Sequence, residues 1–193
     1  MGLGEVLKNI FSNKEKAIKI MFDNIATVGE DRHVISRRVI NNYSDSEDPL
    51  NKLACALAYI NEGASYRKQA IACMEFYFSH PVELPKQKNN NPYFSMWYLH
   101  SELSKLYEKE YLFDKAIAQL ELCIECCDEI NCADFTRIAD ILVKKDSVSD
   151  ALQYLEGIKN MEVYKSIKYA IDCKYNELLD KKAKGYVYNP RKK

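Results

Sequence analysis

The chain has 193 residues, of which 47% are hydrophobic and 29% are charged, a balance typical of a folded globular protein. Lysine and arginine number 28, as do aspartate and glutamate, so the bulk charge favours neither nucleic acid nor an anionic membrane as a partner. The start of the sequence lacks the pattern of a secretory signal, and no apolar run is long enough to span a bilayer. Seven cysteines spread through helix-like segments indicate reduced thiols and predict a cytoplasmic protein.

Helical periodicity dominates, and the first 43 residues predict three short helices. Ser12 and Glu15 form a capping-box pair at the start of the second of these helices. The apolar stripes expected for the three helices are Val6, Leu7, Ile10 and Phe11; Ala17, Ile18, Met21 and Ile25; and Val34, Ile35, Val39 and Ile40. These segments therefore precede the remainder of the chain as N-terminal helices.

After a polar break, the chain predicts helices in pairs and an all-α fold. Asp48 is placed to cap the first of them, and Pro49 occupies its first helical position. The expected pairs are 50–62 with 66–79, 93–109 with 113–127, and 133–144 with 149–158. A final helix covers 163–182 and is ended by Gly185, while the Pro-, Asn- and Lys-rich stretch 80–92 predicts a loop.

The second and third pairs carry similar residue types at the same intervals. Leu103, Ser104, Tyr107, Phe113, Ala116, Leu120 and Cys123 correspond to Ile138, Ala139, Leu142, Val148, Ala151, Leu155 and Ile158. This spacing resembles the tetratricopeptide repeat, in which a large residue precedes a small one and an alanine follows the turn. The first pair fits more loosely, through Cys55, Ala56, Tyr59, Ala70 and Met74.

The resemblance implies an α-solenoid of about three helical hairpins over 49–163. Residues 1–43 would form an N-terminal cap, 164–184 a C-terminal helix and 185–193 a tail, all within a single domain over 1–193. Within each pair, the small residues are expected where the two helices approach most closely. A helical bundle that matches the repeat spacing by chance remains the alternative.

Proteins that resemble tetratricopeptide arrays are mostly binding scaffolds, which hold a partner along a concave groove lined by the first helix of each pair. The resemblance therefore implies an adaptor that binds a protein or peptide, with no catalysis and no cofactor. The repeat register turns these residues inward: Tyr98, Ser101, Lys105, Glu108, Lys109, Thr136, Arg137, Asp140 and Lys144. That mixed, somewhat basic surface suits a segment of acidic or polar character, although it could equally be an ordinary solvated helix face. The oligomeric state is left open.

One tetratricopeptide subgroup grips the terminal carboxylate of a peptide with Lys and Asn at set inward positions. Ser101 and Lys105 stand at those positions in this chain. Neither matches the subgroup, so recognition of a chaperone tail of that kind is not expected.

The cysteines give the nearest approach to a metal motif, at Cys123, Cys126, Cys127 and Cys132. Zinc sites usually pair spaced cysteines across a turn, and Cys123 holds a core position of the repeat, so we expect no metal. The histidines are far apart in sequence, and there is no phosphate-binding loop or nucleophile elbow. We therefore expect the protein not to be an enzyme.

An alternative function is a transcriptional or signalling regulator, in which the N-terminal helices contact DNA and the repeat array senses a partner. Arg37, Arg38, Asn41 and Asn42 follow a glycine-containing turn, as in a recognition helix. Against this, Asn24 and Glu30 stand where a helix-turn-helix needs apolar residues, and the chain has no net positive charge. Nucleic acid is therefore the less favoured partner.

Leu53, Leu57 and Ile60 occupy inward positions in the first pair, where the later pairs are polar. Covering each of these side chains is worth about 1.5–3 kcal/mol, so we expect something to lie on them. Residues 1–43 are the predicted cover. The competing interpretation is that this apolar face binds a partner.

Overall fold

The computed structural model describes residues 30–84, 86, 94–127 and 130–190, and in these ranges the protein is all-α, as predicted. The helices expected before residue 29 lie outside the described residues. The chain divides into two compact units, Met1–Phe94 and Ser95–Lys193, which we describe separately. A single repeat domain over the whole chain therefore stays a prediction.

The first unit contains α2 (Glu30–Tyr43), α3 (Pro49–Glu62), the short 3-10 helix η1 (Ala64–Tyr66) and α4 (Arg67–Ser79). The predicted start of α3 is confirmed, because the Asp48 side chain accepts hydrogen bonds from the backbone N–H groups of Leu50 and Asn51. The helix ends at Gly63, whose φ of 101° is one that only glycine adopts without strain.

α3 lies between α2 and α4 and packs against both. It is buried without interruption from Leu53 to Tyr59, which explains why its sequence shows no polar stripe there. Polar contacts join α2 to the C-terminal end of α3: Glu62 accepts a hydrogen bond from His33 Nδ1 at 2.8 Å and forms an ion pair with Arg37 Nε at 3.1 Å.

The apolar face that was expected to need a cover is largely buried. Leu53 and Leu57 are buried and Ile60 is half-buried. The hydrogen bonds and ion pairs between α2 and α3 involve Cys55 and Glu62 of α3 rather than these three residues. Val34, which belonged to the predicted covering stripe, is 65% exposed. The other predicted stripes lie outside the described residues, so the identity of the cover stays a prediction.

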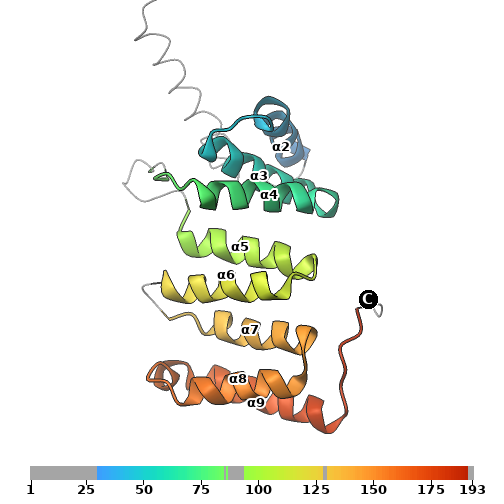
Figure 1. The fold of residues 1–193 in the computed structure, drawn as a ribbon, viewed down its shortest axis with the longest axis vertical. Coiled ribbons are helices and arrows are strands. Elements are labelled where there is room, and N and C mark those ends of the chain that lie inside the picture. Colours follow the sequence, from blue (N-terminus) through green and yellow to red (C-terminus); the bar gives the residue numbers. More distant parts are fainter. Residues whose placement is uncertain (1–29, 85, 87–93, 128–129, 191–193) are drawn as a thin grey trace, which may run out of the picture. The chain divides into compact units, whose positions relative to one another are not determined.

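The second unit contains α5 (Met96–Lys109), α6 (Phe113–Glu125), α7 (Cys132–Lys145), α8 (Val148–Lys159) and α9 (Tyr164–Ala183). These helices run side by side in chain order, and each packs against the next (Figure 1). In addition, α7 packs against α9. The ends of all five lie within a few residues of those predicted.

Small residues are buried at the predicted contact positions of both pairs in the second unit. Ser104 of α5 is fully buried and its hydroxyl donates to the backbone carbonyl of Ala116 on α6 at 2.9 Å. Ala139 of α7 and Ala151 of α8 are fully buried within one apolar cluster. A larger side chain at either alanine would force two helices apart.

The last helix ends as expected at Gly185, which has a φ of 64°. The N–H of Gly185 donates to the carbonyl of Lys182 at 3.0 Å, and that of Tyr186 to the carbonyl of Lys181 at 3.0 Å. This pair of bonds is the Schellman motif, which satisfies carbonyls that the helix itself leaves without donors.

Candidate functional site

All nine residues predicted to line a groove lie on α5 and α7 of the second unit. Lys105 and Lys109 are exposed, and Ser101 is buried. The half-buried members are Tyr98, Glu108, Thr136, Arg137, Asp140 and Lys144. We call the surface made by these residues the α5–α7 face.

Three of the predicted residues meet at one point of this face. The Glu108 carboxylate on α5 pairs with Arg137 Nη2 at 3.4 Å and also with Lys144 Nζ, both on α7. Burial works to raise the pKa of Glu108, but the hydrogen bonds and charges of Lys144 and Arg137 outweigh it, so the pKa is lowered. Glu108 is therefore a carboxylate at neutral pH and ties the two helices together.

A second charged contact connects α7 with α9. Asp140 Oδ1 lies 2.6 Å from Lys174 Nζ, which also lies 2.9 Å from Glu177 Oε2. Burial works to lower the pKa of Lys174, but its hydrogen bonds to the two carboxylates raise it overall. Sequence reasoning missed Lys174, because α9 falls outside the three predicted repeats and has no register.

Sequence reasoning also missed a partly buried contact between α5 and α7. Trp97 Nε1 donates to Asp134 Oδ2 at 2.7 Å, and Asp134 is only 3% exposed. A buried carboxylate needs such a donor to offset its lost hydration. The only tryptophan of the chain and an aspartate in the first turn of α7 were a signal, but neither belongs to the repeat pattern.

Other predicted residues of this face have different surroundings. Lys105 pairs with Glu102 of its own helix, and Lys109 has an interaction within the chain as well. Ser101 is 4% exposed and offers a partner little surface, since a serine side chain ends close to the helix backbone. Lys105 is thus paired with a carboxylate of its own helix, whereas Arg137 and Lys144 share the single carboxylate of Glu108.

The cysteines divide into buried and accessible thiols. Cys123 is fully buried, and this burial raises the pKa of its thiol to about 12, so the unreactive thiol form dominates. Cys126 is exposed, while Cys127 and Cys132 are half-buried. Among the described residues, no group of three or more His, Cys, Asp or Glu side chains is placed to hold a metal ion.

The α2 residues that suggested DNA contact have mixed surroundings. Arg37 is paired with Glu62 of α3, whereas Arg38, Asn41 and Asn42 are exposed. The position of Asn24 lies outside the described residues. Separately, none of the helices described combines the length and the apolar character needed to cross a bilayer.

No protein-family model matches the chain, and comparisons with curated proteins and with solved structures return no match either. What the protein does is therefore inferred from its own residues.

Proposed function

We propose that the protein is a binding scaffold whose α5–α7 face holds a segment of a partner protein or peptide of acidic or polar character. In this proposal the α5–α6 and α7–α8 pairs are two hairpins of a tetratricopeptide-like α-solenoid, and α9 closes its C-terminal end. In such a solenoid, the first helices of successive hairpins lie next to each other and form one face.

The observation that carries the proposal is the direct contact between first helices. Glu108 of α5 reaches Arg137 and Lys144 of α7, and Trp97 of α5 donates to Asp134 of α7. These bonds support the interpretation that α5 and α7 present their side chains on one side. That side is charged and partly exposed, which suits recognition of a polar segment more than of an apolar helix.

We extend the proposal to a role without catalysis, because the histidines have structural partners. His33 is bonded to Glu62 and His100 to Gln119, each at 2.8 Å. His80 stacks on Phe76 with ring centroids 4.5 Å apart and bonds to the carbonyl of the same residue. His33 and His100 thus join neighbouring helices, and His80 contacts its own helix.

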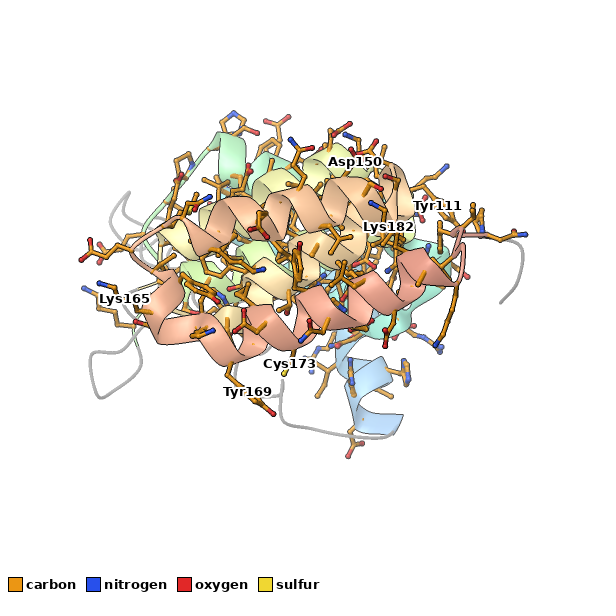
Figure 2. The ribbon with its side chains drawn as sticks, turned by 90° about the horizontal axis from the view of Figure 1, so that it is seen from below. Tyr111, Asp150, Lys165, Tyr169, Cys173 and Lys182 are labelled. Atoms are coloured by element: carbon orange, nitrogen blue, oxygen red, sulfur yellow. The ribbon has the colours of Figure 1, made fainter. Side chains whose placement is uncertain are left out.

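Affinity purification from the native cell tests the proposal. The full chain would be compared with Lys105→Glu and Arg137→Glu, and with Lys165→Glu as a control of equal charge change. Lys165 is an exposed residue in the first turn of α9 (Figure 2). The partner should be depleted by the first two variants and retained by the control. Equal recovery with all four chains would contradict the proposed face.

A further inference from the structure

The α5–α7 face contains one place at which two cations already bind a carboxylate. Glu108 is held between Arg137 and Lys144, with one oxygen toward each cation. The three side chains are 21%, 24% and 32% exposed in that order, so the contact is accessible from solvent.

The two cations are arranged as a pair by the helix itself. Arg137 and Lys144 are seven positions apart on α7, which is about two helical turns, so they lie on the same side of that helix. Both already converge on a single carboxylate. The guanidinium of Arg137 and the ammonium of Lys144 can therefore bind another carboxylate in the same way once Glu108 has moved away.

We propose that Arg137 and Lys144 form the binding site for a side-chain carboxylate of an acidic partner segment, and that Glu108 is its internal competitor. This inference rests on the proposed function, since it assigns the partner's chemistry and the regulation of the same face. The partner's Asp or Glu displaces the Glu108 side chain, which then turns toward solvent.

The exchange explains how a face whose charges are paired can still bind. A single partner carboxylate gains roughly the contact that Glu108 loses, so the exchange is almost neutral. Glu108 is also covalently attached, which gives it an effective concentration of the order of millimolar. Only a segment with several carboxylates competes well, because its attachment elsewhere raises the local concentration of the next one. The competitor therefore discriminates against isolated acidic residues.

The test measures fluorescence anisotropy of a fluorescein-labelled oligoglutamate peptide with an amidated C-terminus. The full chain would be compared with Glu108→Gln, and with Glu156→Gln as a matched control. Glu156 carries the same charge, but it is an exposed residue of α8 and pairs with Lys159 of its own helix. Arg137→Gln and Lys144→Gln complete the set, and thermal unfolding verifies that each variant is folded.

We expect Glu108→Gln to bind the peptide about fivefold more tightly, the order of change available from a partly exposed ion pair. Glu156→Gln should change affinity by less than about twofold, through long-range charge alone. Arg137→Gln and Lys144→Gln should weaken binding by the native chain, and each should do so more strongly in the Glu108→Gln background.

The outcomes separate this inference from the proposed function. Weakening by Arg137→Gln without tightening by Glu108→Gln would leave the face as a binding site and overturn the competitor. Equal tightening by Glu108→Gln and Glu156→Gln would reduce the effect to net charge and also overturn it. Failure of both the native chain and Glu108→Gln to bind would contradict the acidic partner and overturn this inference, whereas the proposed function has its own test in the affinity purification. If Glu108→Gln does not fold, Glu108→Ala replaces it under the same criteria.

Discussion

The two helix pairs of the second unit bury small residues at matching positions of the repeat but have different turns. In the α5–α6 pair, the Ser104 hydroxyl meets the Ala116 carbonyl, and in the α7–α8 pair Ala139 and Ala151 are fully buried. Where two helices approach closely only small side chains fit, so few residue types can occupy this position.

The two turns differ because the unpaired backbone groups at a helix end can find hydrogen-bond partners in different ways. The α5–α6 turn places Tyr111 at a φ of 61°, and the Leu112 N–H donates back to the Tyr107 carbonyl at 2.9 Å. The α7–α8 turn instead uses Ser147, whose hydroxyl accepts from the Asp150 N–H at 3.2 Å as an N-cap. Substitutions by larger residues at the contact positions should therefore destabilise both pairs. The effect of a substitution in a turn should depend on how that turn is hydrogen-bonded.

The largest expected effect is at the contact itself. Ala116→Leu and Ala151→Leu should each lower the free energy of unfolding by about 1–3 kcal/mol, because the longer side chain separates the helices. The control is Ala118→Leu, at an exposed position of α6. Thermal denaturation should show a clear loss for the first two only. An unchanged melting temperature for both variants would contradict the placement of Ala116 and Ala151 at helix–helix contacts.

A smaller effect is expected at the turn between α7 and α8. Ser147→Ala removes the N-cap and should destabilise the protein by about 1 kcal/mol. Ser149→Ala, at an exposed position inside α8, should have little effect or stabilise slightly. Urea denaturation measures both. Equal responses would show that the cap of α8 is not supplied by Ser147.

In the turn between α5 and α6, glycine should be more stabilising than alanine at the position of Tyr111. At a positive φ, a side chain costs about 1–2 kcal/mol, which glycine avoids. Tyr111→Gly should therefore be more stable than Tyr111→Ala, which also loses the ring contact with Phe113 but keeps the backbone strain. The difference between the two variants, measured by urea denaturation, isolates the backbone. Greater stability of the alanine variant would contradict the assigned turn.

The smallest effect concerns the polar contacts between the pairs. The pKa of Glu108 is lowered from 4.5, so the stability it adds is present above that pH and is lost as pH falls through its lowered pKa. Glu108→Gln should flatten the acid limb of the stability–pH curve by about 0.2–1 kcal/mol. Glu125→Gln, at an exposed position of α6, serves as the control. Identical acid limbs for the native chain and Glu108→Gln would show that this contact adds no stability.

Local signals made much of the fold predictable. The cap at Asp48, the terminator Gly185 and the small residues Ser104 and Ala116 are properties of a few neighbouring residues or of one fixed interval. Their chemistry is therefore readable from the sequence. The short helix η1 was missed, because Ala64–Tyr66 falls at the turn between the predicted helices 50–62 and 66–79, where no periodicity indicates the conformation.

The site was less predictable, because its contacts join residues far apart in sequence. Glu108 and Arg137 were each predicted to face the groove, but their pairing depends on how α5 and α7 lie together. The same holds for Trp97 and Asp134, which are 37 positions apart. Periodicity predicts which side of a helix is buried, whereas it does not predict which charged side chains reach each other across two helices.

The most direct test of the proposed binding face is site-specific photo-crosslinking in the native cell. A photoreactive residue would be introduced at Thr136, on the α5–α7 face, and in a second chain at Gln153, an exposed position of α8. The account predicts that a partner rich in Asp and Glu is crosslinked from Thr136 and not from Gln153. Crosslinking of the same partner from Gln153 but not from Thr136 would contradict it.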